Sequence, residues 1–116
     1  MNVLMVEPGM APCSVVLEDG LAAMQEAVGG SIEAVYPFEE AVALICNEEG
    51  KLLGLPLNRA LRHPETGEIY DIIAGTFFLC AAPPESEDFE SLTEEQMERY
   101  MEYYLTPEFF FGQAFR

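Results

Sequence analysis

Apolar residues occur in short runs that turn signals separate along the whole chain. Runs of about four to eight β-branched, aromatic and other apolar residues are typical of β-strands. The pattern predicts strands over Val3–Val6, Ser14–Leu17, Ile32–Tyr36, Ala41–Cys46 and Ile69–Cys80. The last run is the longest, and Asp71 and Gly75 interrupt it, which indicates a bulge or a close approach of backbone at that place.

A short segment after the second predicted strand has helical spacing. Leu21, Met24, Gln25 and Val28 recur at helical spacing, and Gly29-Gly30 gives a strong stop signal. The sequence therefore predicts a short amphipathic helix over 21–28.

A second helix is predicted near the C-terminus. Thr93 is a favourable N-cap residue, and its spacing to Gln96 fits a capping box. The helix should run to about Tyr104, with Pro107 just beyond it. Its apolar stripe is Met97, Tyr100, Met101 and Tyr104, and Glu94, Glu95, Glu98 and Glu102 lie off that stripe.

The remaining segments indicate turns and an edge element. We expect a tight turn over 47–51, with Gly50 at a positive φ, and another turn over 64–68. Gly and Pro interrupt the apolar segment 54–61, so we interpret it as an ordered loop or an edge segment, not a central strand. The aromatic tail over 108–112 should dock on the body of the protein.

These elements predict one domain over residues 1–116. The order of strands and helices is that of an α+β domain, with an antiparallel or mixed sheet on which the short helix and the C-terminal amphipathic helix pack. A chain of 116 residues is long enough for one hydrophobic core.

Charge and cysteine content narrow the range of functions. The chain has 21 acidic residues against 5 Lys and Arg, a net charge of −16, so no general basic surface exists for nucleic acid or anionic lipid. The first residues lack the basic and long apolar regions of a signal peptide. The three cysteines, Cys13, Cys46 and Cys80, are an odd and widely spaced set, two of them in apolar runs. Reduced core cysteines and a cytoplasmic location are therefore expected.

Several motifs resemble a known family. They are Val28-Gly29-Gly30-Ser31-Ile32-Glu33-Ala34-Val35, Cys46-Asn47-Glu48-Glu49-Gly50-Lys51, Gly54-Leu55-Pro56-Leu57-Asn58-Arg59-Ala60-Leu61 and Tyr70-Asp71-Ile72-Ile73-Ala74-Gly75-Thr76-Phe77-Phe78. Together they resemble the domain of unknown function family 3846, small proteins of bacteriophages and other mobile elements in Firmicutes. The resemblance implies a mobile-element origin and transfers no catalytic residue.

Basic residues gather in one part of an otherwise acidic chain. Lys51, Arg59, Arg62 and His63 lie within 13 positions. One interpretation is an anion pocket. In it, the guanidinium of Arg59 binds a phosphate with two hydrogen bonds, the amide of Asn58 recognises the ligand and Lys51 supplies a point charge. The other is internal pairing with nearby carboxylates. Asn47 and Asp71 also have two interpretations each. Asn47 is either a ligand contact or a hairpin turn residue, and Asp71 is either an acceptor in a pocket or a structural cap. The candidate ligand-binding residues are Asn47, Lys51, Asn58, Arg59 and Asp71.

Catalytic motifs are absent from the sequence. It has no nucleophile elbow, phosphate-binding loop or paired-histidine metal motif, and His63 is its one histidine. We therefore expect a protein without enzymatic activity, cofactor or metal.

Two functions follow as hypotheses. The first is a protein that sequesters a small, phosphate-containing, nucleotide-type signalling ligand of host antiviral defence, at an interface between copies of the chain. The alternative is an acidic DNA mimic that inhibits a host restriction or CRISPR-type enzyme. It rests on nine acidic residues between Glu85 and Glu108, and it implies a basic host protein as partner.

Overall fold

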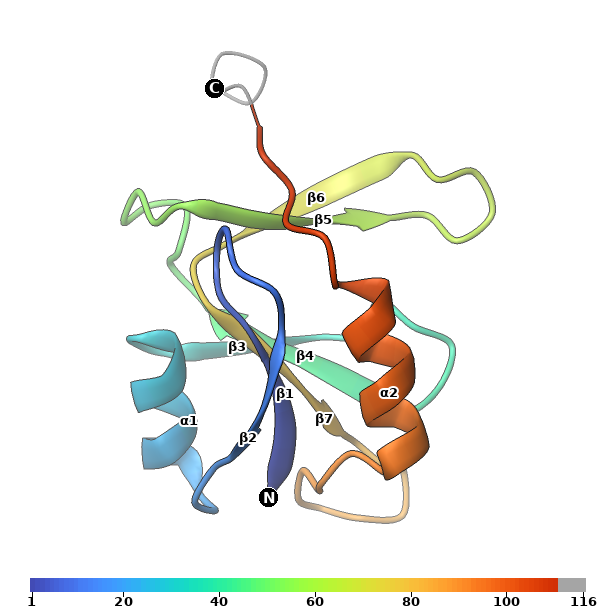
Figure 1. The fold of residues 1–116 in the computed structure, drawn as a ribbon. Helices are drawn as coiled ribbons and strands as arrows, with labels where there is room; N and C mark the ends of the chain where they lie inside the picture. The colour runs from blue at the N-terminus through green and yellow to red at the C-terminus, as the bar shows by residue number, and fades with distance from the viewer. Residues whose placement is uncertain (111–116) are drawn as a thin grey trace.

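A computed structural model describes residues 1–110 as two helices and seven strands (Figure 1). The strands are β1 (Asn2–Val6), β2 (Cys13–Val16), β3 (Ile32–Val35), β4 (Val42–Asn47), β5 (Leu57–Arg62), β6 (Ile69–Ala74) and β7 (Phe77–Ala81). The helices are α1 (Leu21–Val28) and α2 (Glu94–Tyr103). The predicted α+β class is confirmed, and every strand pair is antiparallel.

The main sheet has five strands in the order β2-β1-β7-β4-β3. Its three inner strands are buried on both faces, because side chains along a strand alternate between the faces and both faces are covered. One face of β1, β4 and β7 packs with α1, and the other packs with α2 and the hairpin. Figure 1 shows the two helices on opposite sides of this sheet. Covering both faces explains why these strands are continuous apolar runs in the sequence.

Strands β5 and β6 form a separate two-stranded hairpin above one end of the main sheet (Figure 1). The segment 54–61 is thus partly a strand, and the expected edge character is confirmed because β5 pairs with β6 alone. The run Ile69–Cys80 is two strands in two sheets. The chain passes between them at Gly75, which has a φ of +87° that side-chain-bearing residues rarely adopt.

Both helices end and begin as the sequence predicts. Gly29 caps α1 in the left-handed conformation, and Thr93 and Gln96 form the capping box of α2. The stripe of α2 also faces the core, where Tyr100 and Tyr104 are buried. Leu21 lies off the buried face of α1: it is 54% exposed, and α1 packs through Met24, Ala27 and Val28.

Gly50 differs from its predicted role. The turn exists but extends over residues 48–54, and its glycine with a positive φ is Gly54, at +69°. Gly50 is needed for space, since a Cβ atom there would lie 2.5 Å from the carbonyl oxygen of Ala74.

The segment after α2 lies along the hairpin. Glu108 accepts a hydrogen bond from the backbone N–H of Ala60 at 2.9 Å, so this part of the predicted tail does dock. Phe109 is 82% exposed, and Phe111 and Gly112 lie outside the described residues.

Candidate functional site

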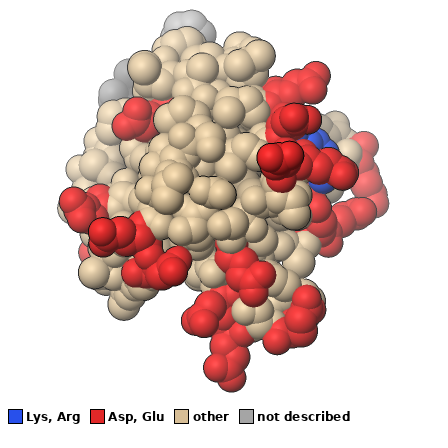
Figure 2. Space-filling view, turned by 60° about the horizontal axis from the view of Figure 1, so that its bottom comes forward, with Lys and Arg blue, Asp and Glu red and all other residues tan. Residues whose placement is uncertain are grey.

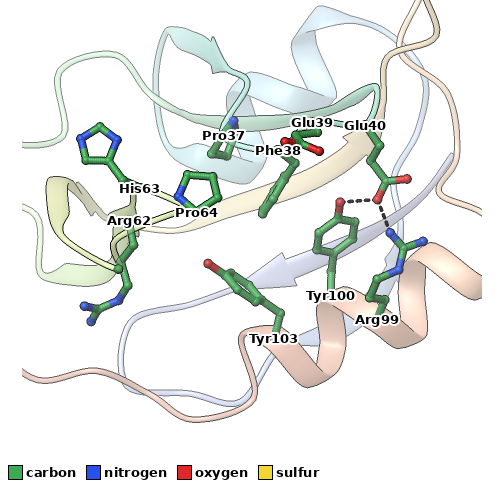
Figure 3. Close-up of a pocket in the computed structure, with 11 residues that line it drawn as sticks. Pro37, Phe38, Glu39, Glu40, Arg62, His63, Pro64, Arg99, Tyr100 and Tyr103 are labelled. Carbon is green, nitrogen blue, oxygen red and sulfur yellow. Dashed lines mark hydrogen bonds and ion pairs between the residues drawn. The ribbon is translucent and has the colours of Figure 1, made fainter.

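A concave surface with aromatic walls lies between α2, the β5–β6 turn and the loop before β4 (Figure 3). We call it the aromatic groove. Its volume is about 670 Å³, which is within the range of small-molecule sites. Its principal residues are Phe38, Glu40, Arg62, His63, Arg99, Tyr100 and Tyr103.

Three aromatic rings form one wall of this groove. The ring of Phe38 lies 4.6 Å from that of Tyr100 and 5.9 Å from that of Tyr103, the second contact being edge-to-face. Tyr100 is buried, whereas Tyr103 is 57% exposed. An exposed ring held by edge contacts offers its face to a planar ligand.

A carboxylate network closes one end of the aromatic groove. Glu40 accepts hydrogen bonds from the Tyr100 hydroxyl, from the guanidinium of Arg99 and from Gln96 Nε2 (Figure 3). The hydrogen bond from Tyr100 is the main reason that the pKa of Glu40 is lowered, and burial opposes it. Burial and the neighbouring Glu40 raise the pKa of Tyr100, so its hydroxyl stays a donor at neutral pH. At this end of the groove, the Glu40 carboxylate therefore already has hydrogen-bond partners within the protein.

The other end of the aromatic groove is formed by the β5–β6 turn. Arg62 Nη2 pairs with Glu108 Oε1 at 2.6 Å, and its side chain remains 42% exposed. The ring of His63 lies 4.7 Å from that of Tyr70. A single contact leaves further N–H groups of a guanidinium available, so this end has the free hydrogen-bond donors.

Three of the residues predicted to bind a ligand meet in a different, smaller hollow. Asn47, Lys51 and Asp71 line a cavity of about 180 Å³, where the Lys51 ammonium pairs with the Asp71 carboxylate. The amide of Asn47 donates to the carbonyl of Val28 at 3.2 Å and accepts from the N–H of Glu49 at 2.8 Å. Internal pairing and turn chemistry therefore account for these contacts.

The other two predicted residues lie in the core. Asn58 and Arg59 are 0% and 1% exposed. Asn58 Nδ2 donates to the carbonyls of Val6 at 2.9 Å and Gly75 at 2.8 Å. Its Oδ1 accepts from Arg59 Nη1 at 3.0 Å. The anion pocket expected from Lys51, Asn58 and Arg59 does not form, because the core encloses the last two and supplies their partners.

The guanidinium of Arg59 also donates hydrogen bonds to backbone carbonyl oxygens. It donates to the carbonyl of Tyr104 from Nε and Nη2, and to that of Met10 from Nη2 at 2.7 Å. Burial lowers the pKa of Arg59, and the nearby Glu108 opposes this effect. Among residues 1–110, no buried side-chain polar atom lacks a hydrogen-bond partner.

The groove contains residues that the sequence did not single out as a site. The basic cluster signalled Arg62 and His63, but Glu40, Arg99 and Tyr103 were missed. The signal available in the sequence was the close spacing of Tyr100, Tyr103 and Tyr104. One buried stripe of a helix does not need all three rings, which indicates that one of them lies at the surface.

The described part of the chain contains neither a candidate metal site nor a candidate membrane-spanning helix. Residues 1–110 contain no group of three or more His, Cys, Asp and Glu side chains placed to hold a metal ion. Over the same residues, neither helix has the length and apolar character that crossing a bilayer requires. Burial raises the pKa of the Cys46 thiol to about 11, so this cysteine is protonated and unreactive at neutral pH.

Comparison with known proteins identifies a family. The model of a domain of unknown function (DUF3846) matches residues 1–105, which is most of the chain, and this confirms the resemblance seen in the motifs. No curated protein and no solved structure matches the chain.

Proposed function

We propose that this chain, which belongs to the DUF3846 family, binds a small nucleotide-type ligand in the aromatic groove. The observation that carries the proposal is an aromatic wall with the exposed ring of Tyr103, beside two arginines and a histidine, in a chain of net charge −16. The site differs from the one that the sequence indicated, while the ligand class is the same.

Stacking would hold the planar part of the ligand. The exposed ring of Tyr103 stands against Phe38, so a nucleobase packed on it would gain aromatic contact without displacing core residues. Stacking of a base on an aromatic side chain contributes about 1–3 kcal/mol.

Electrostatics set the orientation of such a ligand. Arg99 is occupied by Glu40, and Glu39 adds a further negative charge at that end. Arg62 and His63 stand at the opposite end, where Arg62 has one ion pair, with Glu108, and its remaining N–H groups could donate to a phosphate. These charges favour a ligand with its phosphate over the β5–β6 turn and its base over α2.

Sequestration is the role that fits binding of this kind. A protein that holds a nucleotide signal without converting it lowers the free concentration of that signal. This would serve a mobile element against a host antiviral defence. A second copy of the chain over the groove would bury Tyr103, which is 57% exposed, and would complete the enclosure of the ligand.

Calorimetric titration with adenosine diphosphate ribose and with cyclic dinucleotides tests the proposal. We expect micromolar binding that weakens at least tenfold in Tyr103→Ser and in Arg62→Gln. The matched controls are Tyr36→Ser, a tyrosine 59% exposed outside the groove, and Lys51→Gln, an ion-paired cation at the smaller hollow. Both should bind as the natural chain does. Failure of every nucleotide to bind at millimolar concentration, or equal losses in the controls, would refute the proposal.

The acidic DNA-mimic hypothesis receives less support from the surface. The acidic residues of α2, Glu94, Glu95, Glu98 and Glu102, are exposed. On the face in Figure 2, however, the acidic side chains form separate groups around a neutral centre. Mimicry of a duplex requires charge concentrated along one continuous face.

A further inference from the structure

A second large hollow lies at the opposite end of the molecule from the hairpin. It is between the start of α1 and the loop that joins β7 to α2, and its volume is about 760 Å³. Apolar side chains and carboxylates line it together: Leu21, Met24 and Phe89, with Asp19, Glu87 and Asp88. We call it the acidic groove. It shares no lining residue with the aromatic groove.

The floor of the acidic groove is apolar and continuous with the core. Met24 and Phe89 are partly buried and pack against the cluster beneath α1. Leu21 is 54% exposed, so the first turn of α1 leaves an apolar side chain unpartnered at the edge of the hollow. Methionine and leucine side chains of this kind adapt to varied apolar groups.

The rim of this groove is mainly negative. Asp19, Glu87 and Asp88 are exposed, and no Lys or Arg among residues 1–110 lines the hollow. The N-terminal ammonium of Met1 also lies here and pairs with Asp19 at 3.5 Å, so carboxylates still outnumber cations at the rim. Figure 2 views this end of the molecule and shows groups of acidic side chains bordering a neutral surface. Carboxylates on either side of a low-dielectric floor favour a cationic occupant.

The loop that carries the rim is ordered by its own contacts. Ser86 Oγ accepts from the N–H of Asp88 at 3.2 Å and donates to the carbonyl of the same residue at 3.1 Å. Backbone pairing of Glu90 with Ala81 then fixes the end of the loop to β7. The acidic side chains are therefore presented from a fixed backbone.

We propose that the acidic groove docks a cationic segment of another protein, with an apolar side chain inserted between Leu21 and Phe89 and lysine or arginine at the rim. Charge complementarity selects this occupant: a second copy of this acidic chain would bring like charges together, and a nucleic acid would be repelled. The docking surface is separate from the nucleotide-type site.

Fluorescence anisotropy with short labelled peptides tests this proposal. A peptide of alternating lysine and leucine should bind, and its affinity should fall as salt is raised. A lysine–serine peptide lacks the apolar anchor and a glutamate–leucine peptide lacks the charge, so both should bind at least tenfold more weakly. Equal binding of the lysine–serine peptide would show charge attraction alone and would overturn the proposal.

Variants of the chain locate the binding surface. The triple variant Asp19→Asn, Glu87→Gln, Asp88→Asn should weaken the lysine–leucine peptide about tenfold. The matched control, Glu94→Gln, Glu98→Gln, Glu102→Gln, removes the same number of charges from α2 and should change affinity less than twofold. Leu21→Ser should weaken binding severalfold, whereas Leu52→Ser, at an 86% exposed leucine elsewhere, should not. Equal effects of the two triple variants would refute the assignment.

The two binding proposals fail separately. Nucleotide titration should be unchanged in the triple variant of the acidic groove, and peptide binding should be unchanged in Tyr103→Ser. If the peptide does not bind while nucleotides do, the acidic groove proposal alone is refuted.

Discussion

The guanidinium of Arg59 on β5 donates two hydrogen bonds to the carbonyl oxygen of Tyr104, from Nε at 3.3 Å and from Nη2 at 2.8 Å. Tyr104 is the C-cap of α2, and the preceding residue, Tyr103, lines the aromatic groove. A buried cation on the hairpin therefore fixes the end of the helix that carries two of the groove's aromatic rings. In this way the core of the protein holds the groove in shape.

Replacement of Arg59 tests this link. Arg59→Met leaves two buried acceptors, on Tyr104 and Asn58, and the partly buried carbonyl of Met10 without their donor. We expect the free energy of unfolding to fall by about 3 kcal/mol in urea denaturation, because each unsatisfied buried group costs about 1–3 kcal/mol. Arg59→Lys should also destabilise, since an ammonium cannot reproduce the planar fork.

The control for this measurement is Arg62→Met. Arg62 makes a partly exposed ion pair with Glu108, so its loss should cost less than about 1 kcal/mol. Equal losses at the two positions would mean that the buried network does not stabilise the fold.

Asn58 and Arg59 mark the limit of what the sequence predicts. Two polar residues within an apolar segment must find partners, and that much was readable from the chain. The identity of those partners could not be predicted from the sequence, because Tyr104 and Met10 are 45 and 49 positions away from Arg59. An anion pocket and an internal network were both compatible with the local pattern.

The same contrast applies to the fold and the aromatic groove. The capping box at Thr93 and the stop at Gly29 depend on neighbouring residues alone, and both are confirmed. The groove joins Phe38, His63 and Tyr103, which meet because of strand order and the placement of the hairpin. Strand order depends on pairing between distant segments, which apolar periodicity does not specify.

Substitution of Gly50 tests whether this glycine is required by the close approach of its backbone to Ala74, rather than by a positive φ. Asparagine tolerates the left-handed conformation, so Gly54→Asn should cost less than about 1 kcal/mol of unfolding free energy. Gly50→Asn places a Cβ atom against the carbonyl oxygen of Ala74 and should cost about 1–3 kcal/mol. Thermal denaturation of the two variants in parallel decides it, and a reversed order would contradict the steric explanation.

The capping box of α2 should have a measurable share in stability. Thr93 Oγ1 accepts from the N–H of Gln96 at 3.1 Å, and Gln96 Oε1 accepts from the N–H of Thr93 at 3.0 Å. Thr93→Ala should lower the free energy of unfolding by about 1 kcal/mol in urea titration. Thr93→Ser keeps the acceptor and should stay within about 0.5 kcal/mol of the natural chain. A serine variant as unstable as the alanine variant would argue against capping.

Glu40 should make stability depend on pH. The pKa of Glu40 is lowered in the folded chain, chiefly by the hydrogen bond from Tyr100, from a usual value of 4.5. The ionised carboxylate is thus favoured by folding, so its contribution is fully present above pH 4.5 and is lost as pH falls through the lowered folded value. Glu40→Gln should therefore destabilise by about 1 kcal/mol at pH 7, and the difference from the natural chain should shrink below pH 4.5.

Comparison with Glu95 separates this network from general surface charge. Glu95 is also an ion-pair partner of Arg99, at 3.5 Å, but its side chain is 88% exposed and Tyr100 does not donate to it. Glu95→Gln should change the free energy of unfolding by less than about 0.5 kcal/mol at any pH, since exposed pairs contribute little. Urea titrations of both variants between pH 3 and pH 7 give the comparison. Parallel curves for Glu40→Gln and the natural chain across that range would show that the carboxylate charge is not what Tyr100 and Arg99 recognise.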